Sequence, residues 1–168
     1  MRLPIIISAG LLLSFGLNLP VMSKSPIEIA QSPASNNSNL KRLQKRLEFN
    51  RNFWNRQNIS NYEYTLSNSC FCIADARGPV KIKVRYGQTT SITSVATGKP
   101  VNPEYFQNYN TIPKLFDVIQ DAINRKAFSL NVQYSAGFGY PTKIDIDYNS
   151  QIADEEKYLI IENFKVIK

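Results

Sequence analysis

The alternation of apolar and polar residues divides the chain into helical and extended segments. The first clear pattern is helical: apolar residues return every three or four positions, and basic residues cover the other side. We expect this helix to begin near Ser38 or Asn39, either of which can cap exposed backbone N–H groups, and to end near Gln57. Its apolar stripe, which must be buried against a sheet, consists of Leu40, Leu43, Leu47 and Trp54.

From Tyr62 onward the period changes to two, which is typical of β-strands. The expected strands cover residues 62–72, 80–86, 92–95, 129–135, 142–148 and 158–167. A second helix lies between the third and fourth strands, with Thr111 as its cap and Pro113 in its first turn. The buried stripe of this helix consists of Ile112, Leu115, Phe116, Ile119 and Ile123.

Two segments match each other in spacing and pattern: residues 79–87 (PVKIKVRYG) and residues 141–149 (PTKIDIDYN). A helix and a strand precede each segment, and a turn and another strand follow it. The pattern predicts an α+β fold of two helix–strand–strand–strand units that share one antiparallel sheet, with both helices packed on one face. The outward side chains are basic in one segment and acidic in the other, and they would pair if the two strands were neighbours. These side chains are Lys81, Lys83 and Arg85 against Asp145 and Asp147.

The N-terminus reads as a secretory signal peptide. Met1-Arg2 precedes an apolar run over residues 3–21, and short side chains at Val21 and Ser23 suit cleavage after about Ser23. Residues 24–39 are rich in Ser, Asn and Pro and are expected to be a flexible linker, which leaves residues 40–168 as one domain. The alternative is an uncleaved membrane anchor. Cleavage would give a periplasmic or extracellular protein without a stable membrane span.

Composition excludes several function classes. The 168 residues contain no histidine, so Ser-His-Asp and Cys-His relays and His-ligated zinc or haem are impossible. The formal net charge is +7, but residues 58–168 carry 12 basic and 11 acidic groups and are nearly neutral. Most of the excess positive charge lies in the first helix. A charge confined to one helix is a poor match to a nucleic-acid-binding domain. We read this basic face as a solvated helix surface, or as a contact for an acidic partner protein or an anionic envelope surface; it consists of Lys41, Arg42, Lys45, Arg46, Arg51 and Arg56.

Cys70 and Cys72 are the two cysteines of the chain. In an exported protein they are expected to oxidise, most simply with each other. On a flat strand, residues two apart have Cα atoms roughly 6.6 Å apart with nearly parallel side chains, which does not suit a disulfide. The bond therefore requires the strand to end or bulge at Ser69. The alternatives are paired buried thiols, or metal or redox chemistry.

An acidic segment that begins at Asp145 resembles a calcium-binding loop. Its oxygen-bearing residues occupy positions 1, 3, 5 and 12 of such a loop: Asp145, Asp147, Asn149 and Glu156. Ser150 stands where the sharp turn requires glycine, and the two aspartates already fit strand alternation. The simpler interpretation is an exposed strand face followed by an acidic turn, and calcium is the only cofactor that the pattern suggests.

Several of these motifs together resemble an exported bacterial family catalogued as domain of unknown function 6174. The resemblance covers about residues 45–165, and it implies a single exported domain without implying an activity or a cofactor. Some similar proteins resemble lipoproteins, whereas no cysteine follows the apolar run here. The motifs are Tyr62-x-Tyr64, Cys70-Phe71-Cys72, Pro79-Val80, Ile112 to Phe116, Gly139-Tyr140-Pro141-Thr142, Ile146-Asp147 and Ala153-Asp154-Glu155-Glu156.

These patterns favour binding over catalysis. The leading hypothesis is an exported, non-catalytic binding or accessory domain of the cell envelope that meets its partner through a sheet face or the basic helix. One alternative is a calcium-stabilised exported protein. A second is an enzyme that does not use histidine, which would require a concave pocket with convergent polar groups.

Overall fold

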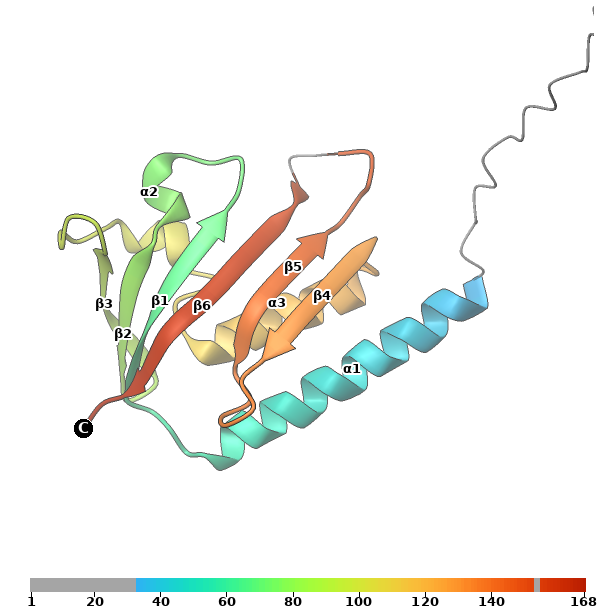
Figure 1. The fold of residues 1–168 in the computed structure, drawn as a ribbon, viewed down its shortest axis with the longest axis horizontal. Helices are drawn as coiled ribbons and strands as arrows, with labels where there is room; N and C mark the ends of the chain where they lie inside the picture. Colours follow the sequence, from blue (N-terminus) through green and yellow to red (C-terminus); the bar gives the residue numbers. More distant parts are fainter. Residues whose placement is uncertain (1–32, 153–154) are drawn as a thin grey trace, which may run out of the picture. The chain divides into compact units, whose positions relative to one another are not determined.

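The computed structural model describes residues 33–152 and 155–168 and has an α+β architecture (Figure 1). Its helices are α1 (Pro33–Arg56), α2 (Ala74–Arg77), the 3₁₀ turn η1 (Pro103–Phe106) and α3 (Ile112–Asn124). Its strands are β1 (Tyr62–Ser69), β2 (Val80–Arg85), β3 (Gln88–Ser94), β4 (Ser129–Tyr134), β5 (Pro141–Asp147) and β6 (Lys157–Val166). The expected signal peptide, residues 1–23, lies outside the described residues.

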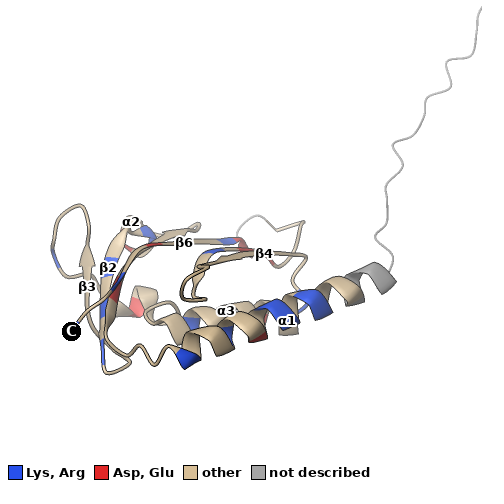
Figure 2. Cartoon of the chain, turned by 60° about the horizontal axis from the view of Figure 1, so that its bottom comes forward, with Lys and Arg blue, Asp and Glu red and all other residues tan. Residues whose placement is uncertain are grey.

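The six strands form one antiparallel sheet in the order β3-β2-β1-β6-β5-β4. Helices α1 and α3 lie together on one face of this sheet, and the other face is open (Figure 2). This arrangement agrees with the predicted α+β class and with helices packed on one face. The two segments with matching sequence, in β2 and β5, are separated by β1 and β6, so their basic and acidic side chains do not pair across strands.

Helix α1 begins at Pro33, earlier than the predicted start at Ser38 or Asn39. Proline suits the first turn of a helix because its missing N–H would have no helical partner there. The helix therefore includes residues 33–39, which the composition assigned to the linker. In the described part of the chain, no helix is long and apolar enough to cross a membrane.

The core lies between the sheet and the two helices. The alternation expected for β1 is confirmed, since Tyr62, Tyr64 and Leu66 are buried on the helix side. Six residues of α3 supply the opposing surface; five of them are the predicted stripe, and Ala122 is an addition: Ile112, Leu115, Phe116, Ile119, Ala122 and Ile123. Thr111 caps this helix as predicted, because its side chain accepts a hydrogen bond from the backbone N–H of Lys114.

Two tyrosine hydroxyls connect β1 to the start of α3. The Tyr64 hydroxyl donates to the backbone carbonyl of Tyr109 at 2.6 Å, and the backbone N–H of Ile112 donates to the Tyr62 hydroxyl at 3.0 Å. Ile112 is the first residue of α3, so Tyr62 satisfies one of the N–H groups that a helix leaves unpaired. Burial raises the pKa of Tyr62 to about 12, although its bond with Ile112 opposes the shift. Both hydroxyls have buried partners, which holds the 109–112 segment against the sheet.

Aromatic side chains join α1 to the sheet. Trp54 is buried, and its ring meets those of Tyr62, Tyr140 and Phe164 edge-on at 5.5, 6.2 and 5.6 Å between centroids. The turn that carries Tyr140 fits closely under α1, because a Cβ atom on Gly139 would lie 2.8 Å from the backbone oxygen of Asn50. The Gly-Tyr-Pro-Thr motif therefore acts as a packing element between the β4–β5 turn and α1.

Candidate binding surface

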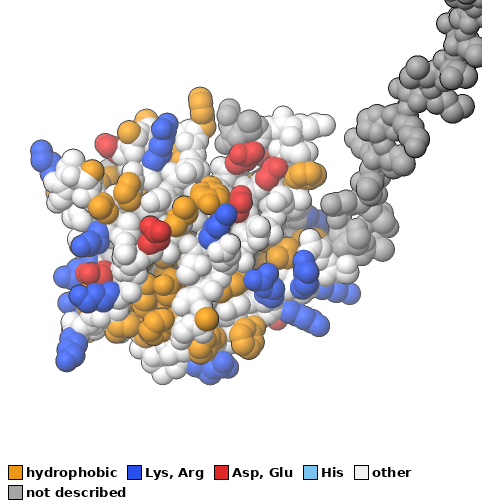
Figure 3. Space-filling model, viewed as in Figure 1, with side chains coloured by type: hydrophobic (Ala, Val, Ile, Leu, Met, Phe, Trp, Pro, Cys, Tyr) orange, Lys and Arg blue, Asp and Glu red, His pale blue; other side chains and the backbone are white. Residues whose placement is uncertain are grey.

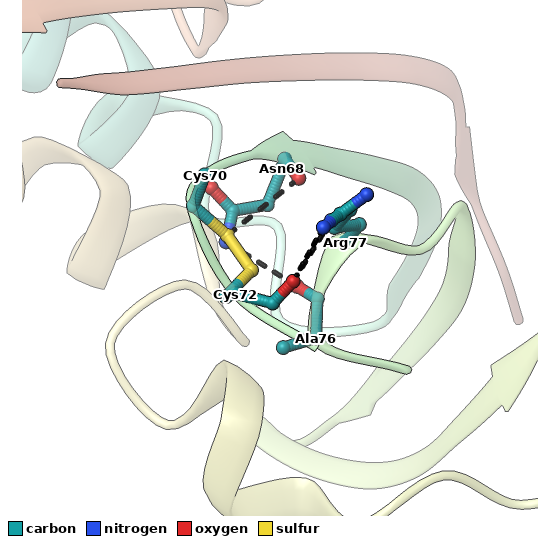
Figure 4. Close-up of a disulfide and its surroundings, with 5 residues drawn as sticks. All are labelled: Asn68, Cys70, Cys72, Ala76 and Arg77. Atoms are coloured by element: carbon teal, nitrogen blue, oxygen red, sulfur yellow. Dashed lines mark hydrogen bonds between the residues drawn. A yellow bond between two sulfur atoms is a disulfide. The ribbon is translucent and has the colours of Figure 1, made fainter. Parts of the chain in front are cut away.

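The cysteine pair lies just beyond the end of β1. The strand ends at Ser69 rather than at Cys72, and the sulfur atoms of Cys70 and Cys72 lie at bonding distance, as a disulfide (Figure 4). The two Cα atoms are 5.3 Å apart. This separation is shorter than the roughly 6.6 Å of a flat strand, so the chain has left the extended conformation here. The sequence required the strand to end or bulge at Ser69, and the structure shows the strand end.

Side chains on both sides of the turn hold it in place. The Arg77 guanidinium donates two hydrogen bonds, at 2.9 and 2.7 Å, to the backbone carbonyl of Cys72. The buried Asn68 side chain donates to the Cys70 sulfur and to the carbonyl of Ala76 (Figure 4). Phe71, at the tip, is 87% exposed. These contacts give Cys70 and Cys72 a structural role in closing the turn.

Thiol titration tests this disulfide. We expect the protein, purified and denatured without reductant, to show no reactive thiols, because its two cysteine sulfur atoms are bonded to each other. After reduction it should show two thiols per chain, from Cys70 and Cys72. A Cys70→Ser variant serves as the control and should show one free thiol without reductant. Two free thiols in the non-reduced wild-type protein would contradict the disulfide.

The acidic segment proposed for calcium consists of a strand and a turn. Asp145 and Asp147 lie on β5, and the Asp147 carboxylate accepts a hydrogen bond from the backbone N–H of Asn149 at 2.9 Å. The Asn149 side chain in turn accepts from the backbone N–H of Gln151. Within residues 33–152 and 155–168, no three acidic or cysteine side chains are grouped to hold a metal ion. Residues 153–154 of the loop lie outside the described residues, so calcium at Asp145, Asp147, Asn149 and Glu156 stays a prediction.

The six basic residues predicted for one helix face divide into two groups. Arg46 and Arg51 turn back onto the domain. The Arg46 guanidinium donates to the carbonyl of Val132 at 3.3 Å, and Arg51 pairs with Asp117 at 3.1 Å while lying over the ring of Phe116. The helical spacing contained a signal for Arg51, which follows the buried Leu47 by one turn and therefore lies on the same side.

The remaining basic residues point outward. Lys41, Arg42 and Lys45, here called the basic stripe, are exposed along the N-terminal half of α1, and Arg56 is exposed near its end. Lys and Arg positions accordingly recur along α1 in the cartoon (Figure 2), and blue side chains gather over the same helix in the space-filling view (Figure 3). Phe49 lies on the same side of the helix with 65% of its surface exposed. An open groove of about 630 Å³ follows these side chains along the helix.

The charges of the basic stripe are not neutralised within the described part of the chain. That part contains two ion pairs, Arg51–Asp117 and Arg125–Asp121, and neither involves the stripe. Arg42 donates to the side-chain oxygen of Asn39, which is neutral. The stripe therefore presents three uncompensated positive charges and an exposed aromatic ring on one helix surface.

A second groove, which the sequence did not reveal, differs in its electrostatics. It occupies about 510 Å³ beside α3, near Tyr148 and Lys157. Two of its polar groups already have partners: the Tyr148 hydroxyl donates to Asp121, and the Lys114 ammonium donates to the carbonyl of Gln107 at 2.6 Å. Burial, followed by the bond to Asp121, raises the pKa of Tyr148 to about 12, so the hydroxyl stays protonated at neutral pH. These groups serve the fold, which leaves the basic stripe as the stronger candidate for binding.

The fold places the chain among α+β domains in which one antiparallel sheet carries two helices on a single face and a short cysteine turn at the end of its first strand. The sequence model of a family of unknown function, DUF6174, matches residues 46–166, and the chain belongs to this family. No curated protein and no solved structure matches the chain. The family match begins at Arg46, so the basic stripe lies immediately before it.

Proposed function

We propose that the protein is an exported, non-catalytic binding domain of the cell envelope that engages an anionic partner through the basic stripe of α1. One observation carries this proposal: Lys41, Arg42 and Lys45 are exposed together and have no acidic partner among the described residues. The remainder of the domain is nearly neutral. A local positive charge on a neutral domain attracts anionic groups to one place on the surface.

Binding explains the surface better than catalysis does. Catalytic groups usually converge in a pocket and have perturbed pKa values suited to proton transfer near neutral pH. Burial is the main cause of the raised tyrosine pKa values here, and it raises the pKa of Tyr62 and of Tyr134 to about 12, so both hydroxyls remain protonated. The export signal expected at residues 1–23 supports this proposal, because it would bring the stripe to the envelope, where acidic proteins and anionic surfaces are both available.

The test is charge reversal of the stripe. We expect the triple variant Lys41→Glu, Arg42→Glu, Lys45→Glu to bind a poly-glutamate matrix about tenfold more weakly than the wild-type protein at low salt. The estimate assumes up to about 1 kcal/mol for each exposed pair, reduced because the pairs share one surface. The measurement is a dissociation constant at several salt concentrations, and salt should weaken wild-type binding because exposed charges are screened.

A matched variant separates the location of the charge from its amount. Lys81→Glu, Lys83→Glu, Arg85→Glu makes the same change in net charge on β2, on the face of the sheet away from the helices. This variant should keep most of the wild-type affinity. Equal losses of affinity in both variants would mean that net charge alone governs binding. Unchanged affinity in the stripe variant would exclude the basic stripe as the binding site. Thermal melts of both variants verify that they are folded.

A further inference from the structure

We propose that strand β4 accepts an extended acidic segment of a partner protein as a seventh strand of the sheet. This inference rests on the proposed function and specifies its ligand and its binding site. Strand addition to a sheet edge supplies backbone hydrogen bonds for affinity, while side chains beside the edge select the sequence. Strand β4 offers both a free backbone edge and selective side chains beside it, and a comparison with the other edge strand, β3, makes this clear.

The β3 edge is covered by the chain itself. Thr93 forms an antiparallel bridge with Pro100, and the backbone N–H of Val101 donates to the carbonyl of Ile92 at 3.0 Å. Near its other end, the Thr89 hydroxyl donates to the carbonyl of Asn110. The segment after β3 therefore occupies the backbone hydrogen-bonding positions at the C-terminal end of this strand, which shortens the edge left for an added strand.

The β4 edge has no such cover among the described residues. Strand β4 (SLNVQY) contains no proline and no charged residue, although these are the usual protection of an edge strand. A single side chain reaches its backbone, because the Arg46 guanidinium donates to the carbonyl of Val132. This contact shows that the Val132 carbonyl points away from β5. In antiparallel pairing the N–H and C=O of one residue point to the same side, and the direction repeats every second residue. The N–H groups of Leu130 and Val132 therefore face the free edge.

The charges beside the β4 edge favour acidic side chains on the helix face of the sheet but not on the open face. On the helix side, Arg46 contacts β4 directly, and the basic stripe ends one residue before Arg46 in α1. On the open side, β4 is paired with a strand that carries carboxylates, since Asn131 lies opposite Asp145 and Ser129 opposite Asp147. The best segment would alternate, with acidic side chains toward α1 and neutral side chains toward the open face.

The same charges disfavour a second copy of this chain at β4. Two copies joined edge to edge by a two-fold axis would bring their α1 helices to the same junction. The basic stripes and Arg46 of both copies would then repel each other, and like charges placed together oppose association. An acidic strand instead neutralises these groups, with Arg46 exchanging the Val132 carbonyl for a carboxylate.

The experiment uses a capped peptide, slightly longer than β4, that alternates Glu and Val. Its control has the same sequence, with backbone N-methyl groups on two of the glutamates and two of the valines, which removes donors that face β4 in either strand direction while keeping the charge. We expect the alternating peptide to bind at least about tenfold more tightly than its N-methylated control, since several backbone hydrogen bonds are lost. Hydrogen exchange should slow at the amides of Leu130 and Val132 on binding. The triple variant of the basic stripe should weaken binding of both peptides.

The outcomes separate this inference from the proposed function. Equal binding of the two peptides, without slower exchange at Leu130 and Val132, would overturn strand addition while leaving the basic stripe as a charge-based site. If the protein bound poly-glutamate or vesicles of anionic phospholipid but did not bind the peptide, strand addition would be overturned and the proposed function would stand. Failure to bind peptide, poly-glutamate and vesicles would overturn both proposals. Association of the peptide-free protein into a dimer that protects Leu130 and Val132 would assign the β4 edge to a second copy instead.

Discussion

Replacement of Trp54 with alanine is expected to lower the free energy of unfolding by about 3–5 kcal/mol, the usual cost of removing a large buried aromatic side chain. Trp54 is 4% exposed and contacts three other aromatic rings. These rings come from β1, β6 and the turn before β5, so the indole joins α1 to most of the sheet. The variant leaves a cavity at this junction, and chemical denaturation measures the loss.

Phe49 provides a matched control on the same helix. It is also aromatic, but 65% of its surface is exposed, so Phe49→Ala should change the free energy of unfolding by no more than about 0.5 kcal/mol. A similar loss in both variants would mean that helix propensity, and not the aromatic junction, accounts for the effect. Destabilisation by Trp54→Ala of less than about 1 kcal/mol would contradict the packing described for α1.

Replacement of Gly139 with alanine should have the second large effect. Gly139 has φ of +81°, where a residue with a Cβ atom is strained by about 1–3 kcal/mol. The added Cβ would also lie 2.8 Å from the backbone oxygen of Asn50 and 3.0 Å from the Phe53 ring. Backbone atoms on both sides must then separate, so the turn and α1 move apart. We expect a lower melting temperature and a change in Trp54 fluorescence as the indole gains solvent.

Gly137, in the same turn, is the control. A Cβ atom there would meet nothing within 4 Å, and its φ lies outside the left-handed region. Gly137→Ala should therefore leave stability nearly unchanged or increase it slightly, because alanine restricts the unfolded chain. If the two alanine variants melted at the same temperature, the close approach of Gly139 to α1 would not be a constraint.

Local patterns predicted most of the secondary structure. Apolar residues at every second position predicted β2. Apolar residues with a period of 3.6, together with Thr111 and Pro113, predicted α3 and its buried stripe. These features depend on neighbours in sequence, so periodicity detects them. Helix α2 and the 3₁₀ turn η1 escaped prediction because short elements of four residues contain less than two turns of a repeating pattern.

The candidate binding surface was predicted only in part. The sequence identified the basic residues of α1, but it grouped Arg46 and Arg51 with the basic stripe. Their partners, Val132 and Asp117, are far away in the chain, and only folding brings them to α1. The free edge at β4 was also beyond the sequence, since alternation identifies a strand without showing which strands are its neighbours.

The sequence by itself determined that this is an α+β domain behind an expected export signal, that histidine chemistry is absent, and that the positive charge is concentrated in one helix. These conclusions follow from composition and from contacts between residues close in the chain. The tertiary structure decided the strand order, the closure of the Cys70–Cys72 turn, and which basic side chains remain free. The strand order and the free basic side chains depend on segments that are distant in sequence and are brought together by the packing of the core. The Cys70–Cys72 turn depends on where β1 ends and on the nearby side chains of Asn68 and Arg77.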